Sequence, residues 1–91
     1  MDTPTSHDRP GPLTRLLPDL PFGALALISG IADAAPEHVA MRLRHLGFRA
    51  GNQVEALRVA PLGDPTIYRV LGYEMCLRRH EARHIWVAVL P

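Results

Sequence analysis

The chain of 91 residues contains no lysine, one cysteine and few aromatic residues (one tryptophan, two tyrosines and two phenylalanines). Ten arginines and nine acidic residues leave a formal net charge of +1. A chain so close to neutral has no overall attraction to nucleic acid or anionic lipid. The lone Cys76 excludes an internal disulfide framework and suits a reducing compartment. Without lysine, a phosphate-binding P-loop is also excluded.

Long apolar runs are absent as well. The longest, residues 85–90, is far below the ~20 residues that a membrane helix needs. The polar, proline-rich start does not resemble a signal peptide. We therefore expect a soluble cytoplasmic protein without membrane insertion. Its length predicts one domain over residues 13–91, preceded by a flexible leader at residues 1–12.

Short runs of alternating or apolar residues predict a mostly β domain. Residues 24–31 are apolar on both faces, so this strand is expected to be buried on both sides or to join a small barrel. Thr14 is a candidate N-cap for one helical turn before it. In residues 53–60 the apolar face changes after Ala56, which predicts a β-bulge. The further predicted strands are residues 66–71, 73–78 and 85–90. Five short strands separated by turn signals predict a small SH3-like β-barrel.

One substantial helix interrupts these strands, at residues 35–48. Pro36 fits its first position. Gly47 can take the left-handed conformation that ends a helix, and Phe48 can fold back onto Leu43. The apolar stripe consists of Val39, Leu43 and Leu46.

Basic residues flank this stripe, and two interpretations stay open for them. They form either a solvated surface or a site for an acidic partner or anion, which clustered arginine suits. The residues are His38, Arg42, Arg44, His45 and Arg49.

Two other residues also have two readings. Cys76 is expected to be a small core or semi-buried residue rather than a reactive thiolate. Trp86 belongs either to a second core face or to an exposed aromatic anchor for a partner.

Residues 80–84, His-Glu-Ala-Arg-His, match the H-E-x-x-H pattern of zinc metalloproteases. Only about six residues separate the flanking strands, so the helix has one or two turns. A zinc peptidase also needs a third protein ligand and an open position for water. We therefore expect no enzyme and no obligatory cofactor. His80, Glu81 and His84 instead form a candidate non-catalytic surface site for Zn or Fe(II), against the alternative of two exposed histidines.

Several motifs in order carry a family resemblance over residues 16–90. They are "LPDLPFG" at 17–23, "RLRHLGF" followed by "GNQVE", "APLGDP" at 60–65, and "VLGYEMCLRRHEA" at 70–82. With these motifs the chain resembles FeoA, the small cytosolic component of bacterial ferrous iron uptake. The resemblance assigns Glu81 and Ala82 to an L-R-x-x-E-A turn, in which Glu81 accepts backbone N–H bonds.

The resemblance implies an SH3-like barrel with a helical insertion and a non-enzymatic function. Members of the family are thought to bind and modulate FeoB, a membrane Fe(II) transporter with a cytosolic G-protein-like domain. The chain would then be peripheral to the membrane through this partner, and a homodimer is a further option. We predict partner contacts at Arg42, Leu46, Phe48, Arg49 and Trp86.

One alternative is a nucleic-acid-binding barrel, although the near-neutral charge and few aromatic residues argue against it. Its candidate phosphate contacts are Arg42, Arg44, Arg49, Arg58, Arg78, Arg79 and Arg83. A zinc peptidase is the weakest alternative.

Overall fold

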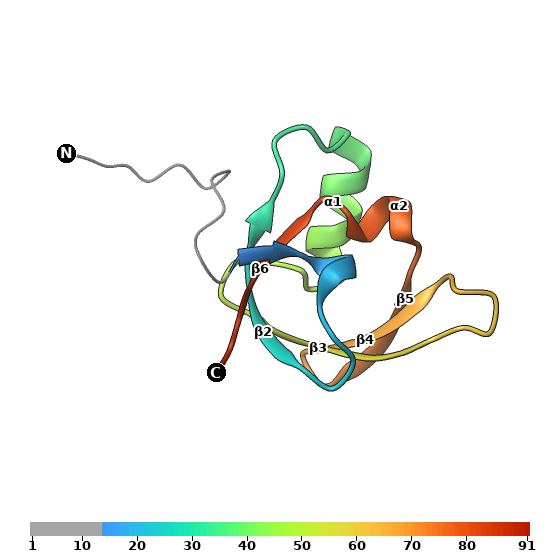
Figure 1. Cartoon of the computed structure of the whole chain (residues 1–91). Helices are drawn as coiled ribbons and strands as arrows, with labels where there is room; N and C mark the ends of the chain where they lie inside the picture. Colours follow the sequence, from blue (N-terminus) through green and yellow to red (C-terminus); the bar gives the residue numbers. More distant parts are fainter. Residues whose placement is uncertain (1–13) are drawn as a thin grey trace.

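The computed structural model describes residues 14–91, whose six strands form one antiparallel sheet (Figure 1). The elements are β1 (Thr14–Leu16), the 3-10 turn η1 (Leu17–Asp19), β2 (Leu25–Ile31), α1 (Glu37–His45), β3 (Gln53–Val59), β4 (Thr66–Val70), β5 (Tyr73–Leu77), α2 (Arg79–Ala82) and β6 (Ile85–Val89). The predicted leader at residues 1–12 lies outside the described residues and stays a prediction.

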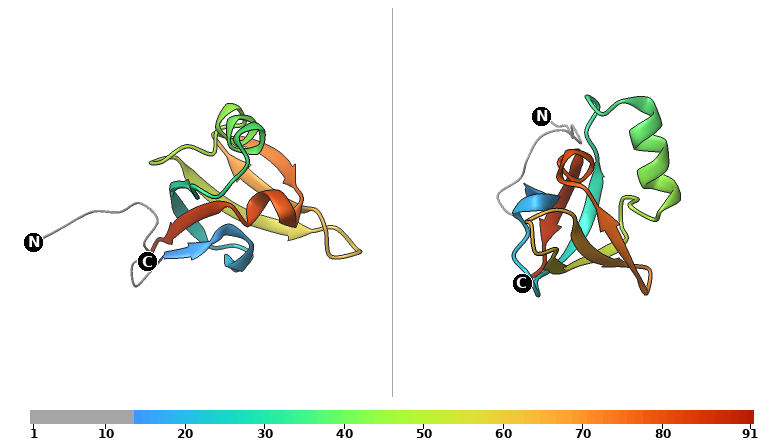
Figure 2. Two further views of the ribbon diagram at one scale, coloured as in Figure 1. Left: turned by 90° about the horizontal axis from the view of Figure 1, so that it is seen from above. Right: turned by 90° about the vertical axis from the view of Figure 1, so that its right-hand side faces the viewer.

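The strands lie in the order β1-β6-β2-β3-β4-β5. The sheet coils around a core, and Figure 2 shows α1 standing outside the strands. Within residues 14–91, β1 and β5 are the two sheet edges, so the barrel does not close by hydrogen bonding. The predicted mostly β, SH3-like fold is confirmed, with six strands instead of five.

The sixth strand, β1, was missed because residues 14–16 were predicted to begin a helical turn. Thr14 was predicted to cap a helical turn, but it lies in β1 and pairs with Ala88 of β6. The helical turn forms just afterwards, as η1, with Pro18 at its start. A strand of three residues depends on its antiparallel neighbour, so the local pattern does not reveal it.

Strand β2 buries one face only, which favours the small barrel over burial on both sides, the two alternatives for this strand. Ala26 and Ile28 are buried, whereas Leu25 and Leu27 are each 39% exposed. The described strands form a single sheet, and its convex side has no second sheet over it.

The end of helix α1 confirms the predicted termination. Gly47 has φ +105°, and its N–H donates to the Arg44 carbonyl at 3.1 Å. The Phe48 N–H donates to the Leu43 carbonyl at 3.0 Å, which completes a Schellman motif. At the other end, Pro36 precedes the helix as its N-cap rather than occupying the first helical position.

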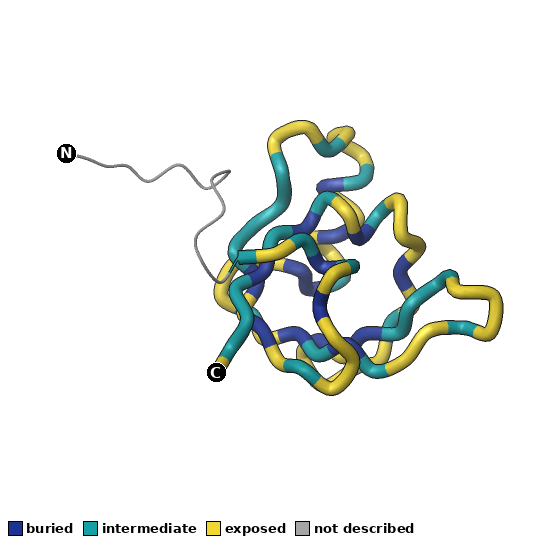
Figure 3. The backbone as a smooth tube through the Cα atoms, viewed as in Figure 1, coloured by how far each residue is buried: buried dark blue, intermediate teal, exposed yellow. Residues whose placement is uncertain are grey.

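The core lies between the inner face of the sheet, η1 and one side of α1, and the buried segments line this interior in Figure 3. In β3 the pairing with β4 shifts between Ala56 and Arg58, which confirms the predicted bulge. The largest fully buried side chains are Tyr68, Phe48, Leu17, Ile28, Leu43, Leu77, Ile85, Val54, Val70 and Val87.

Cys76 corrects another prediction, because it is exposed. Cys76 lies on β5 next to Leu77, whose side chain faces the core. Because successive side chains of a strand alternate, the Cys76 side chain faces outward. The alternation of β5 was predicted correctly, but the face that holds Cys76 is the outer one.

Candidate functional site

The His-Glu-Ala-Arg-His segment forms helix α2 and the turn that leads into β6. Helix α2 has four residues, so it is a single turn, within the one or two turns that the short spacing predicted. Its backbone is helical, since the Ala82 and Arg83 N–H groups donate to the carbonyls of Arg78 and Arg79. This turn is too short for the long helix on which a zinc peptidase carries its two histidines.

Glu81 has the local structural role that was predicted for it. One carboxylate oxygen, Oε1, accepts the Arg78 backbone N–H at 3.2 Å, at the start of α2. The other, Oε2, accepts from Nη1 of Arg42 on α1 at 2.7 Å. Both oxygens are engaged and the side chain is only 14% exposed, so these contacts compete with any binding of a metal by Glu81.

The metal set of His80, Glu81 and His84 stays a prediction, and its two histidines are the members with no such side-chain contacts in the described part of the chain. Residues 14–91 contain no group of three His, Cys, Asp or Glu side chains that could hold a metal ion. His80 is exposed on α2, and His84 follows one residue after the helix ends. The pKa of His84 is lowered, mainly by burial and then by the nearby charges of Arg83 and His80.

Asp64 ties the loop between β3 and β4 to the start of α2. Its Oδ1 accepts the Arg79 backbone N–H at 2.9 Å, and its Oδ2 lies 3.8 Å from Nη1 of Arg78. Burial raises the pKa of Tyr68 and the charge of Asp64 raises it further, although a hydrogen bond with Thr66 and the charge of Arg79 lower it. Nothing in the sequence indicates this contact between Asp64 and a residue 15 positions away.

The predicted partner contacts on and after α1 are divided by the structure. Arg42 and Arg49 are exposed, and Leu46 is partly buried against the core. Phe48 is fully buried, so its ring supports this surface from beneath and cannot contact a partner. The reason is the Schellman turn, which folds Phe48 back under α1.

Trp86 lies on the outer face of β6, since its neighbours Ile85 and Val87 point into the core. It is partly exposed and is not a member of the buried cluster. Its register partners are Leu16 on β1 and Gly30 on β2. This position removes the second-core-face reading and keeps Trp86 as a candidate contact.

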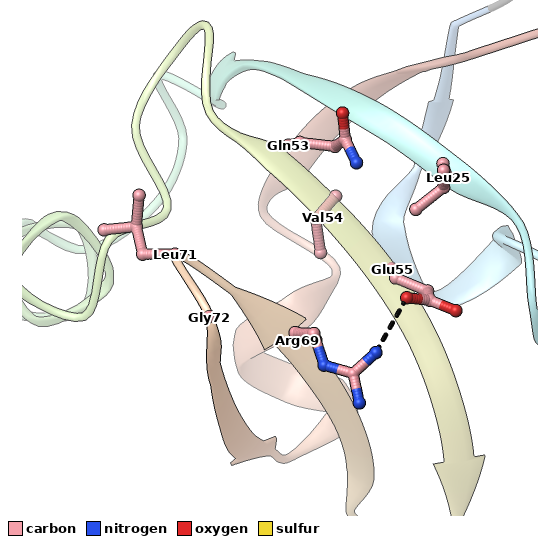
Figure 4. Close-up of a pocket in the computed structure, with 7 residues that line it drawn as sticks. All are labelled: Leu25, Gln53, Val54, Glu55, Arg69, Leu71 and Gly72. Carbon is pink, nitrogen blue, oxygen red and sulfur yellow. Dashed lines mark hydrogen bonds and ion pairs between the residues drawn. The ribbon is translucent and has the colours of Figure 1, made fainter.

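A surface pocket of about 350 Å³ lies on the outer face of β2, β3 and the β4–β5 turn (Figure 4). Leu25 and Leu71 form opposite sides of it. Its two charged side chains bind each other, with Arg69 Nη1 3.1 Å from Glu55 Oε1. This pocket therefore has no unmatched charge with which to orient a ligand.

A second pocket, of about 280 Å³, lies between the end of β2 and the segment after α1, and Arg44 and Arg49 both line it. Arg44 was absent from the predicted partner contacts, although it flanks α1 as Arg42 does. The two arginines differ because Arg42 forms an ion pair with Glu81, which is distant in the sequence.

The arginines of the nucleic-acid alternative do not form one free basic surface. Arg42, Arg58 and Arg78 each lie within ion-pair distance of a carboxylate. Phosphate binding would have to compete with these internal partners. Within residues 14–91, moreover, no helix is both long and apolar enough to cross a bilayer.

Comparison with known proteins identifies relatives of this chain. The FeoA domain family model matches residues 15–89. The Fe(2+) transport protein A/Fe(2+) transporter FeoB fusion protein of Porphyromonas gingivalis is 37% identical over 49 residues. The match covers 54% of this chain but only 6% of that relative's length.

Two solved structures share the fold. The FeoA protein from Chlorobium tepidum has 36% identity and a TM-score of 0.76, covering 85% of this chain and 71% of that one. FeoA from Stenotrophomonas maltophilia, described as an SH3 domain protein and complexed with zinc, has 33% identity and a TM-score of 0.67. That likeness covers 81% of this chain and 87% of the other.

Proposed function

The chain belongs to the FeoA family, and on that basis we propose that it is a non-enzymatic accessory protein of bacterial ferrous iron transport. In this proposal it binds an FeoB-type transporter on the side of the cytosolic G-protein-like domain and modulates its activity. The protein acts at the cytosolic face of the membrane through this partner.

The observation that carries the proposal is the fusion protein of Porphyromonas gingivalis, whose name joins an Fe(2+) transport protein A with the transporter FeoB in one chain. Fusion keeps two modules at a high effective concentration, which strengthens the contact between modules that bind each other. A separate chain of the same family would make the same contact between two molecules.

The geometry of α2 supports the non-enzymatic part of the proposal. A general base needs a carboxylate that can reach a water or substrate proton. Glu81 uses both oxygens to bind Arg42 and the Arg78 backbone. We therefore propose no hydrolytic function for the H-E-x-x-H segment.

We propose that the FeoB contact is formed by the segment after α1 together with the outer face of β6. Leu46 and Arg49 supply an apolar and a charged contact on the first of these. Trp86 lies opposite Gly30 in the β2–β6 pairing, and Gly30 lines the same pocket as Arg49. Partly exposed tryptophan and arginine are typical of residues that dominate binding energy.

Binding to a purified FeoB cytosolic domain tests the proposal, with the GTPase rate measured as the chain is titrated. We expect saturable binding, a change in that rate, and a loss of affinity of about tenfold for Trp86→Ala. Arg83→Gln, an exposed change on the other side of α2, serves as the control and should bind normally. Absence of binding at high micromolar concentration, with the wild-type chain folded, would contradict the proposal.

A further inference from the structure

The pocket of about 280 Å³ beside α1 combines charge and apolar surface in a way that no other described pocket does. Its lining residues are Gly30, Ile31, Arg44, Phe48, Arg49 and Ala50. Gly30 and Ala50 have little or no side chain and leave space, while Ile31 supplies apolar surface and the buried Phe48 supports the pocket from beneath. Two guanidinium groups belong to the rim.

Arg49 is held in place by the end of α1. Its Nε donates to the Arg44 carbonyl at 3.1 Å. This bond fixes the base of the guanidinium and leaves its two terminal nitrogens as a fork, the geometry that matches a carboxylate. The side chain is thus oriented before any ligand arrives.

Neither arginine of this pocket is neutralised within the described residues. Among residues 14–91, the carboxylates within ion-pair distance of an arginine lie beside Arg42, Arg58, Arg69 or Arg78. Arg44 and Arg49 have no such neighbour there. The pocket therefore holds two positive charges that a ligand can match.

The carbonyl groups at the end of a helix repel anions, but here two of them are already bonded. The Leu43 carbonyl accepts the Phe48 N–H, and the Arg44 carbonyl accepts the Gly47 N–H as well as Arg49 Nε. These bonds reduce the unfavourable helix-dipole contribution at the pocket.

The adjoining pocket, of about 270 Å³, limits the size of the anion. Arg44 lines it together with Asp33 and Glu37. These two carboxylates would repel the neighbouring charges of a polyphosphate or nucleic acid. A single carboxylate on a short apolar stem fits the charge and the apolar surface better.

We infer that the Arg44–Arg49 pocket binds a single glutamate or aspartate side chain of the protein partner. This inference rests on the proposed function, since it defines the chemistry of that partner's contact. It also replaces Arg42, whose charge Glu81 already balances, by Arg44 as the second basic contact.

A capped peptide with one glutamate between glycines is the direct probe, and binding is followed by NMR of the backbone amides and of the Arg49 Nε–H. We expect shifts at Gly30, Ala50 and Arg49, and no such shifts with the matched peptide that has glutamine in place of glutamate. Arg44→Gln and Arg49→Gln should each weaken binding about three- to fivefold, as expected for partly exposed ion pairs. Arg83→Gln should bind the peptide like the wild type.

Three results would overturn the inference: shifts that map elsewhere, equal weakening by Arg83→Gln, or tighter binding of inorganic phosphate at the same amides. Each variant is checked for a native amide spectrum. Arg49→Lys keeps the positive charge but loses the two parallel N–H donors of the guanidinium. It should bind the peptide more tightly than Arg49→Gln but more weakly than the wild type.

The FeoB cytosolic domain separates this inference from the proposed function. Weaker binding by the Arg44→Gln/Arg49→Gln double variant supports both. Equal binding of wild type and double variant would overturn the inference and leave the proposed function standing. Binding of the peptide without any binding of the FeoB domain would support the carboxylate site and overturn the assignment of its partner.

Discussion

Arg42 and Glu81 lie 39 positions apart in the sequence, yet they join α1 to α2 through an Nη1–Oε2 contact of 2.7 Å. The same carboxylate also accepts the first N–H of the α2 turn. Glu81 therefore connects the inserted helix to the segment that precedes β6. This connection explains why a residue in a zinc-protease pattern has a structural role.

Removal of this carboxylate should destabilise the fold. Glu81→Ala leaves the Arg78 N–H without its acceptor and breaks the contact with Arg42, at a cost of about 1–2 kcal/mol. Arg42→Gln should cost only about 0.5 kcal/mol, because the Arg42 side chain is 52% exposed. Urea denaturation of the two single variants and the double variant gives the coupling energy. A coupling of zero would mean that the ion pair does not contribute to stability.

Gly47 is predicted to be intolerant of a side chain for two reasons. Its φ of +105° disfavours other residues, and an added Cβ would lie 2.9 Å from Leu71 Cδ1 and 3.1 Å from Val70 Cγ1. Gly47→Ala should therefore lower the free energy of unfolding by about 2–3 kcal/mol.

Gly51 is the matched control for this change. Its φ is +94°, but an added Cβ would meet no atom within 4 Å. Gly51→Ala should lose only the conformational contribution, about 1 kcal/mol. Equal losses at the two positions, measured by thermal unfolding, would show that the contact with Leu71 does not matter.

Asp64 should stabilise the start of α2. Asp64→Ala removes the acceptor of the Arg79 N–H and is expected to cost about 1 kcal/mol. Asp64→Asn keeps an oxygen acceptor and should cost less. Asp33→Asn, an exposed acidic change in the loop before α1, is the control and should stay within about 0.5 kcal/mol of wild type. A loss of similar size for Asp33→Asn would argue against a specific cap.

The environment of His84 predicts a pH dependence of stability. Its pKa in the folded state lies below the ordinary value of 6.5, first because it is partly buried and then because Arg83 and His80 are near. The unfolded chain then binds a proton more readily, so stability is lost as the pH falls below about 6.5. His84→Gln should reduce the difference in unfolding free energy between pH about 7.5 and about 5.5. An unchanged difference, or the same effect from the exposed His45→Gln, would refute this assignment.

Zn titration tests the histidine pair. His80 lies in α2 and His84 lies in the turn that follows it, four positions further along, a spacing that suits two ligands of one surface ion. We expect Zn to shift both imidazole resonances, and either His80→Gln or His84→Gln to remove the effect. Glu81→Gln should leave it unchanged because Glu81 is bound elsewhere. Unperturbed resonances of His80 and His84 would end the metal hypothesis.

The sequence by itself determined the elements whose causes are local. Alternation predicted the later strands and the bulge after Ala56, and the Gly47-Phe48 pair predicted the end of α1. The short spacing around α2 predicted a helix of one or two turns, and one turn forms. These features depend on backbone preferences and side-chain periodicity within a few residues, which one chain reveals without its neighbours.

Only the tertiary structure decided which faces are covered and which charges are matched. Alternation does not tell which face of β5 is the outer one, so Cys76 was assigned to the wrong side. Nothing local distinguishes Arg42 from Arg44, because the difference is Glu81, which the fold brings within 2.7 Å of Arg42. Burial and ion pairing depend on partners far away in the sequence, and these determine which arginines are left to bind a partner.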